Sequence, residues 1–158
     1  MSRPPSTGET EAVTPPTEAV TPPTPSRAIL EGVSLVLVED DPDCRDVLAF
    51  WFEAFGATVT AVGSAREALA HLEQGLPDVV VTDISMPDHD GFWLVERIRH
   101  TLVPRQLYVP VIACSGFDAR VTAEAKQLSA FDGYITKPVD PLRLSTRIAE
   151  LVALSRAA

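Results

Sequence analysis

The centre of this chain reads Asp78-Val79-Val80-Val81-Thr82-Asp83-Ile84-Ser85-Met86-Pro87-Asp88-His89-Asp90-Gly91. Its valines predict a short strand that is buried on both faces, as in a parallel sheet, and that ends at Asp83. Met86-Pro87 and Asp90-Gly91 then turn the chain into a helix whose apolar residues recur at helical spacing, Leu94, Val95, Ile98 and Leu102. A carboxylate therefore ends a central strand, where open α/β sheets form their ligand crevice. Taken alone, Asp83 is better explained as a strand end or a turn cap.

The composition describes a globular chain and excludes several partners. With 158 residues and 46% hydrophobic residues, the chain is large enough for one domain with a proper core. Its net charge of −9 would repel nucleic-acid phosphates and anionic lipid, so neither direct nucleic-acid binding nor membrane docking is expected. No run approaches the roughly 20 apolar residues of a spanning helix, and the proline-rich N-terminus lacks a signal-peptide core. A cytoplasmic location is expected.

The two cysteines are too few for a disulfide framework or a four-ligand zinc site. Cys44 and Cys114 both lie in apolar patterns, which predicts reduced thiols in or near the core.

Residues 1–27 differ from the rest of the chain. They contain half of the 14 prolines, and the heptapeptide Glu-Ala-Val-Thr-Pro-Pro-Thr occurs twice in succession, at 11–17 and 18–24. Such a segment has too little apolar surface to fold, so a disordered Pro/Thr-rich tail is expected. A solvated spacer is favoured over a docking tail.

Residues 32–154 alternate between strand and helix patterns. The expected strands are 33–38, 58–62, 79–83, 109–114 and 134–136, and each is followed by a helical pattern. Ser64 with Glu67 forms a capping box, and Asp140 with Pro141 opens the last helix. The helix from Asp118 to about Ser129 has the weakest apolar stripe. Five such pairs predict an α/β fold of three layers: a doubly wound, flavodoxin-like parallel sheet of strand order 2-1-3-4-5.

That topology brings polar residues from four strands to one edge of the sheet. They are Glu39 and Asp40 after the first strand, Asp83 after the third, Ser115 after the fourth and Lys137 after the fifth. Three neighbouring carboxylates repel one another unless one is protonated or a cation neutralises them, and oxygen-only ligands favour Mg²⁺. A metal-bound carboxylate beside a lysine and a hydroxyl is equipped to accept a phosphoryl group.

Four motifs on the expected elements make residues Gly32 to Leu154 resemble the receiver domains of two-component response regulators, in particular the stand-alone, chemotaxis-regulator-like kind. They are Glu39-Asp40-Asp41-Pro42-Asp43, Asp83-Ile84-Ser85-Met86-Pro87 with Asp90-Gly91, Val111-Ile112-Ala113-Cys114-Ser115-Gly116, and Gly133-Tyr134-Ile135-Thr136-Lys137-Pro138.

The resemblance implies a role for each residue of the expected site. Asp83 would accept the phosphoryl group, and Asp40, Asp83 and the backbone carbonyl of Ser85 would bind Mg²⁺ directly. Glu39 would act through a metal-bound water, and Lys137, which precedes a cis proline in the family, would pair with phosphoryl oxygens. Ser115 and Tyr134 match the switch pair, whose movement would reshape the face made by the fourth helix, the fifth strand and the last helix. An ordinary strand aromatic is the alternative for Tyr134.

The resemblance also implies partners. A histidine kinase or a histidine phosphotransfer protein would donate the phosphoryl group in a two-component system or phosphorelay. No output module follows the last predicted helix, so the output would pass to a downstream protein target, and phosphorylation-dependent dimerisation is left open. Ser85 and Phe117 occupy positions that tune the lifetime of the phosphorylated state, and bulky Phe117 is predicted to prolong it. His89 is expected to be a solvated loop residue.

Two other functions compete with this interpretation. A phosphate-independent interaction module has no need of the complete set Glu39, Asp40, Asp83, Ser115 and Lys137. An aspartyl-phosphate phosphatase usually needs an Asp two residues after the nucleophile, where this chain has Ser85. The chain is therefore expected to catalyse only its own phosphorylation and dephosphorylation, and not to be an enzyme in the usual sense.

Overall fold

The computed structural model describes residues 29–116 and 125–157. The predicted tail and Phe117 lie outside these ranges, as does most of the helix expected from Asp118. Within the described ranges, no helix combines the length and the apolar character that crossing a membrane requires.

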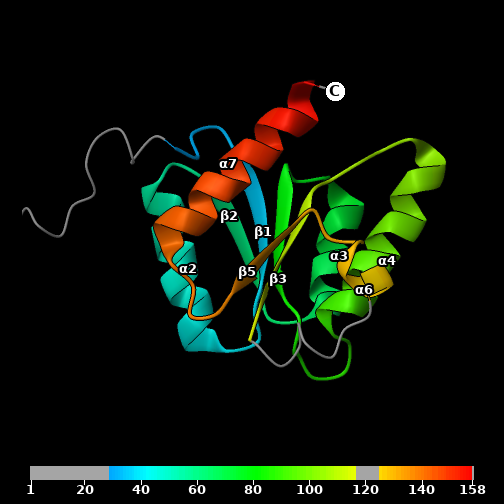
Figure 1. Cartoon of the computed structure of the whole chain (residues 1–158), viewed down its shortest axis with the longest axis horizontal. Coiled ribbons are helices and arrows are strands. Elements are labelled where there is room, and N and C mark those ends of the chain that lie inside the picture. Colours follow the sequence, from blue (N-terminus) through cyan, green and yellow to red (C-terminus); the bar gives the residue numbers. More distant parts are fainter. Residues whose placement is uncertain (1–28, 117–124, 158) are drawn as a thin grey trace, which may run out of the picture.

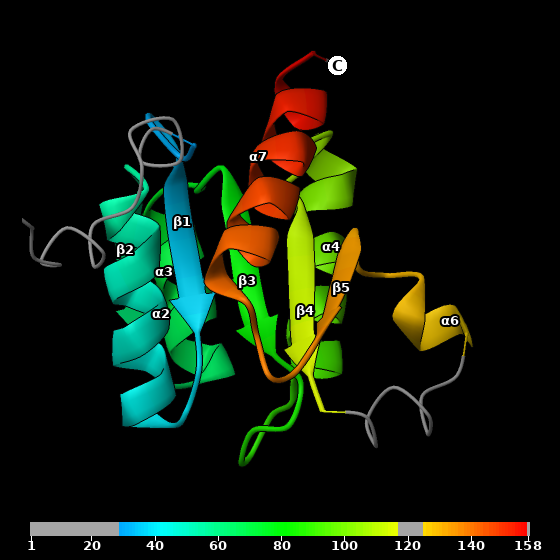
Figure 2. The ribbon, with the colours of Figure 1, turned by 60° about the vertical axis from the view of Figure 1, so that its left-hand side comes forward.

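Five parallel strands form a single sheet in the order β2-β1-β3-β4-β5. They are β1 (Ser34–Val38), β2 (Thr58–Val62), β3 (Val79–Asp83), β4 (Val111–Ser115) and β5 (Gly133–Thr136). Figure 2 shows the carboxyl ends of β1, β3 and β4 at one edge of the sheet. The predicted fold class and strand order are therefore confirmed, with strand boundaries that differ by no more than two residues.

Helices cover both faces of the sheet, as the alternating pattern predicted. They are α2 (Pro42–Ala54), α3 (Ala65–Gln74), α4 (Gly91–Leu102), α6 (Ala125–Leu128) and α7 (Pro141–Ala157), with a short 3₁₀ turn, η2 (Val103–Arg105), after α4. Figure 1 shows α2 and α7 on one face and α3, α4 and α6 on the other. Alternate strand residues face the two helix layers: Leu35 and Leu37 pack with α2 and α7, whereas Val36 and Val38 pack with α3 and α4.

The expected helix starts are present as hydrogen-bonded caps. Ser64 Oγ accepts a hydrogen bond from the Glu67 N–H at 3.2 Å, and the Glu67 carboxylate accepts one from the Gly63 N–H at 3.0 Å. Asp140 likewise accepts from the N–H groups of the first turn of α7. These bonds satisfy donors that a helix leaves unpaired at its start, so they fix where each helix begins.

In α2, one expectation is wrong and a further apolar residue is exposed. Val47 is 55% exposed, whereas Leu48 and Phe52 of the same helix are buried. Cys44 is also exposed and not near the core, whereas Cys114 is buried in β4, where desolvation raises the pKa of its thiol to about 12. Of the apolar residues of α2, only Leu48 and Phe52 are fully buried.

Candidate functional site

The carboxyl edge of the sheet holds the residues that the sequence pointed to. Asp83 is the last residue of β3, Glu39 directly follows β1, and Lys137 directly follows β5. Backbone hydrogen bonds hold the two flanking positions: the Glu39 N–H donates to the Val62 carbonyl at 3.1 Å, and the Lys137 N–H donates to the Ser115 carbonyl at 2.8 Å. The sheet itself therefore sets the spacing of these three side chains.

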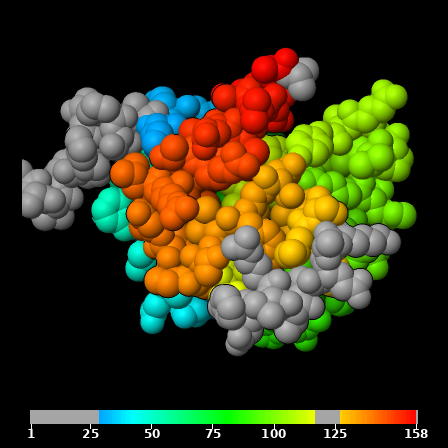
Figure 3. Space-filling view, viewed as in Figure 1, coloured from blue at the N-terminus to red at the C-terminus, as the bar shows by residue number. Residues whose placement is uncertain are grey.

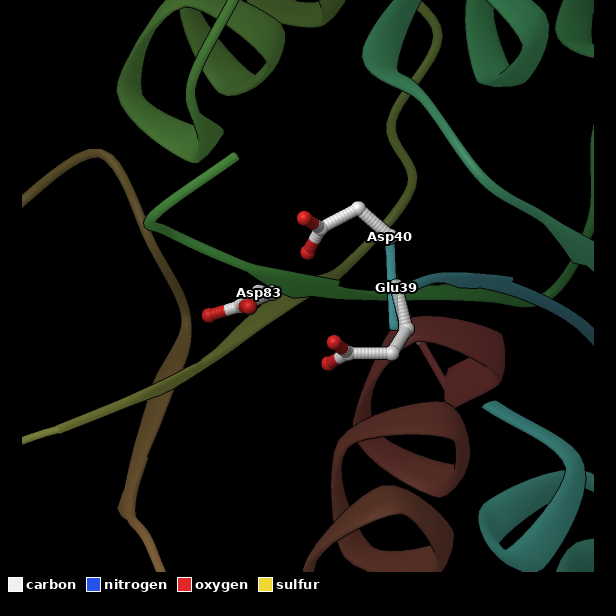
Figure 4. A group of neighbouring side chains, drawn as sticks. All are labelled: Glu39, Asp40 and Asp83. Carbon is white, nitrogen blue, oxygen red and sulfur yellow. The ribbon is translucent and has the colours of Figure 1, made fainter. Parts of the chain in front are cut away.

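Three carboxylates converge at this edge. Glu39, Asp40 and Asp83 each offer an oxygen, and these oxygens lie within 4.8 Å of one another. Figure 4 shows the three carboxyl groups pointing to the same side of the strand ends. Glu39 and Asp83 are buried, at 3% and 6% exposure, while Asp40 is more accessible. Two buried carboxylates beside a third form a site with an excess of negative charge.

Lys137 bridges the two buried acids. Its Nζ lies 3.2 Å from Asp83 Oδ2 and 3.3 Å from Glu39 Oε2. Burial acts to lower the pKa of Lys137, but the charges of Asp83 and Glu39 and their hydrogen bonds outweigh it and raise that pKa. Lys137 is therefore held as a cation beside Asp83.

Glu39 is the acid with the least favourable environment. Burial and then the charge of Asp83 raise its pKa, and the Asp41 N–H and Lys137 only partly oppose this shift. The Asp41 N–H donates to Glu39 Oε1 at 3.2 Å. One lysine cannot neutralise three ionised carboxylates, so Glu39, Asp40 and Asp83 together keep a net negative charge. A small, hard cation that prefers oxygen ligands would neutralise it. The residues present fit Mg²⁺ on this chemistry.

Ser115 contributes a buried hydroxyl to the site. It ends β4, is completely buried, and its Oγ makes no hydrogen bond to any residue of the described ranges. A buried hydroxyl left unpaired costs about 1–3 kcal/mol, so a ligand that accepts its hydrogen bond would offset this cost.

The register of β4 and β5 places Tyr134 near Ser115. Strand register pairs Ala113 with Tyr134 and Ser115 with Thr136, so Ser115 and Tyr134 are diagonal neighbours on one face. The Tyr134 ring meets the Phe131 ring edge to face at 5.7 Å, and its hydroxyl oxygen is shielded from solvent. The ring thus packs on the α4 side of the sheet. This arrangement fits the predicted switch pair without testing its movement.

Other sequence expectations have mixed outcomes. The peptide bond between Lys137 and Pro138 is cis, as the resemblance implied. Ser85 is exposed in the loop after β3, and the metal role of its carbonyl stays a prediction. His89 is not simply solvated, because its ring stacks on Trp93 with centroids 3.8 Å apart.

Sequence reasoning missed Arg45. Its guanidinium donates to the Glu39 carbonyl at 2.9 Å and so supports the backbone that carries two acids of the site. The sequence does contain a signal for this contact: Arg45 lies about one turn into the helix that follows the acidic pair Glu39-Asp40.

Comparisons with known proteins agree with this geometry. Residues 35–149 match the family described as the response regulator receiver domain. An uncharacterized 14.6 kDa protein of Leptolyngbya boryana is 43% identical over 115 residues, which cover 73% of this chain and 86% of that protein. The transcriptional regulatory protein TcrA of Mycobacterium tuberculosis is 34% identical over 84% of this chain, which spans about half (50%) of TcrA. The receiver domain of the Francisella response regulator 1452 superposes with a TM-score of 0.67 at 26% identity, covering 80% of this chain and 100% of that domain.

Proposed function

Because this chain belongs to the response regulator receiver domains of two-component systems, we propose that Asp83 is its phosphoryl acceptor. Phosphorylation of an aspartate is typical of this family. One observation carries the assignment to Asp83: it is the buried carboxylate at the end of the central strand, with the Lys137 ammonium 3.2 Å away. A nucleophile and a fixed positive charge are thus side by side before any donor arrives.

The proposed reaction is a single phosphoryl transfer. An Asp83 oxygen attacks phosphorus, the new O–P bond forms, and the donor's bond to phosphorus breaks so that the leaving group keeps the electron pair. Lys137 stabilises charge on the equatorial oxygens because its Nζ already contacts Asp83. The hydroxyl of Ser115, buried and without a described partner, donates a hydrogen bond to one of those oxygens.

Receiver domains bind Mg²⁺ at an acidic pocket, and we propose that Glu39, Asp40 and Asp83 hold it in this chain, with the carbonyl of Ser85. When bound, the cation supplies neutralising charge for the phosphoryl oxygens and the acids. The convergence of the three carboxylate oxygens supports this ligand set. Asp40 is the member most open to solvent, which suits an exchangeable ion.

Receiver domains accept phosphoryl groups from histidine kinases, and we propose such a kinase or a phosphotransfer protein as donor here, in the cytoplasm. The response would appear on the face made by α6, β5 and α7, part of which is visible at the front of Figure 3. A depression of about 540 Å³ on that face is lined by residues of β5 and α7, among them Tyr134 and Arg143. It supports a site there for a downstream protein or a second phosphorylated copy.

Labelling with acetyl phosphate and Mg²⁺ tests the proposal. Intact mass spectrometry is expected to show one added phosphoryl group on the native chain and none on Asp83→Asn. Asp46→Asn is the matched control, because Asp46 is an exposed acid of α2 outside the acidic group formed by Glu39, Asp40 and Asp83. Beryllofluoride should shift the NMR signals of Ser115 and Tyr134 only where Asp83 is present. A native chain that stays unmodified would favour the phosphate-independent interaction module instead.

A further inference from the structure

The adjacent acids Glu39 and Asp40 need a bend in the chain to serve one ion. Successive residues of a strand point to opposite faces, so neighbours in an extended segment would direct their carboxylates apart. Here β1 ends at Val38, and the backbone bends at Asp40. Figure 4 shows the two side chains leaving neighbouring positions and turning to the same side. The orientation of the peptide group between Glu39 and Asp40 therefore controls whether both carboxylates reach the same point.

Hydrogen bonds from two different elements hold this peptide segment. The Glu39 N–H continues the pairing with β2 by donating to the Val62 carbonyl at 3.1 Å. The Glu39 carbonyl lies beyond the last paired residue of β1 and accepts from Arg45 Nη1 at 2.9 Å instead. Arg45 belongs to the first turn of α2, and its own N–H donates to the Asp41 carbonyl at 2.9 Å. A side chain of α2 thus orients a peptide group that the sheet no longer holds.

Gly63 provides the space for the Arg45 guanidinium. A Cβ atom at Gly63 would lie 2.9 Å from Arg45 Nη1, which is closer than a carbon atom can approach, and 3.9 Å from Arg45 Cζ. Among the described residues other than its chain neighbours, no further atom lies within 4 Å of that position. The Gly63 N–H donates to the Glu67 carboxylate at 3.0 Å, which holds this backbone at the start of α3. A methyl group added at residue 63 would therefore displace the guanidinium and not the backbone.

We propose that Arg45 is a positioning residue for the cation site, and that Gly63 keeps its guanidinium on the Glu39 carbonyl. The inference rests on the metal site of the proposed function. Arg45 does not bind the ion, and its positive charge by itself would weaken Mg²⁺ binding by repulsion. Its contribution is to hold the peptide group so that the carboxylates converge before the ion arrives. Groups that orient metal ligands in this way typically change metal affinity by about tenfold to hundredfold.

Calorimetric titration of the full chain with Mg²⁺ tests the proposal. Arg45→Met removes the donor and keeps an unbranched side chain, and it is expected to weaken Mg²⁺ binding by about tenfold or more. Arg45→Lys retains a donor and should recover part of this loss. Arg66→Met is the matched control, because it removes the same charge from an exposed position of α3 outside the acidic group. It should bind Mg²⁺ as tightly as the native chain.

Gly63→Ala disturbs the same contact without changing any charged group. It should weaken Mg²⁺ binding in the native background and have no further effect in Arg45→Met, because the contact is then already lost. Amide NMR signals of Asp40 and Asp41 should shift in both single variants without Mg²⁺. Gly75→Ala is the control for the added methyl group, since no atom lies within 4 Å of a Cβ there. Where Arg45→Met does not fold, the comparison of the two glycine variants decides.

The outcomes separate this inference from the proposed function. If the native chain binds Mg²⁺, unchanged or tighter binding in Arg45→Met and Gly63→Ala overturns the positioning role and leaves the proposed function standing. Additive losses in the double variant also overturn it, because the two residues would then act through different contacts. A native chain that binds no Mg²⁺ overturns the proposed metal site together with this inference. Weaker binding in both single variants, with no further loss in the double variant, supports the role of Arg45.

Discussion

Ionisation of Glu39 lowers the stability of the folded protein, because its carboxylate is buried beside Asp83. Burial and the neighbouring Asp83 raise its pKa above the value of 4.5 expected in an unfolded chain. A raised folded pKa means that the metal-free protein loses stability as the pH rises from 4.5 through that pKa. Without metal, ionised Glu39 therefore lowers the free energy of unfolding at neutral pH.

We predict that Glu39→Gln makes the metal-free protein more stable at neutral pH and flattens its stability profile in this window. Urea unfolding in a chelator between about pH 5 and pH 8 measures both effects. Glu53→Gln, an exposed position of α2, is the control and should keep the native slope. An unchanged slope in Glu39→Gln would show that Glu39 is not the group responsible.

Substitution of Ser115 should affect the rate of phosphorylation but not the stability of the fold. Its buried Oγ has no hydrogen-bond partner among the described residues, so Ser115→Ala should leave the free energy of unfolding within about 1 kcal/mol of the native value or raise it. Loss of a hydrogen bond to a charged phosphoryl oxygen should slow labelling by about tenfold to a hundredfold. Denaturant unfolding and acetyl phosphate kinetics on the same samples check the pair of effects. A large loss of stability would mean that the hydroxyl supports the fold instead.

At the scale of elements, the start of α4 packs against the end of β3. A Cβ atom at Gly91, the first residue of α4, would lie 2.6 Å from the Asp83 carbonyl oxygen and 2.9 Å from the Ile84 Cα. The Gly91 N–H also donates to the Ile84 carbonyl at 2.8 Å. The helix can therefore reach the backbone of Asp83 only because residue 91 has no side chain.

Gly91→Ala is expected to destabilise the protein by about 1–3 kcal/mol and to slow phosphorylation of Asp83, because the backbone must move apart at the acceptor. Thermal or denaturant unfolding together with acetyl phosphate labelling measures the two effects. Gly75→Ala is the matched control: no atom lies within 4 Å of a Cβ there, and its backbone is extended with φ 164°. Equal effects of the two substitutions would contradict the packing argument.

At the scale of the whole molecule, the acidic group links metal binding to stability. A ligand that binds only the folded state at ten times its dissociation constant stabilises it by about 1.4 kcal/mol. For a domain of this size, Mg²⁺ should then raise the thermal midpoint by roughly 3–6 °C. Asp40→Asn should reduce this shift strongly because it removes one of the three carboxylate ligands, whereas Asp46→Asn should retain it. Scanning calorimetry with Mg²⁺ and with a chelator provides the comparison, and an equal shift in Asp40→Asn would argue against the ligand set.

Much of this architecture is visible in the chain before it folds. The valines of β3, the caps Ser64 and Asp140, and the alternation of patterns predicted the strand order, because periodicity and capping are local properties of a sequence. Parallel strands share a carboxyl edge, so the same reasoning predicted which residues meet there. The apolar pattern around Cys44 misled, because local spacing does not reveal which side of a helix its neighbours will cover.

The identity of the elements and the membership of the acidic group followed from residue order alone, since each depends on local chain direction and on one rule of sheet topology. The environment of each group depended on packing between segments far apart in sequence. Folding buried Glu39 and Asp83 more deeply than Asp40, placed Lys137 between two of them, and left Val47 exposed beside the β5–α7 connection. Burial and electrostatic contact are properties of assembled layers, and no single segment of sequence contains them.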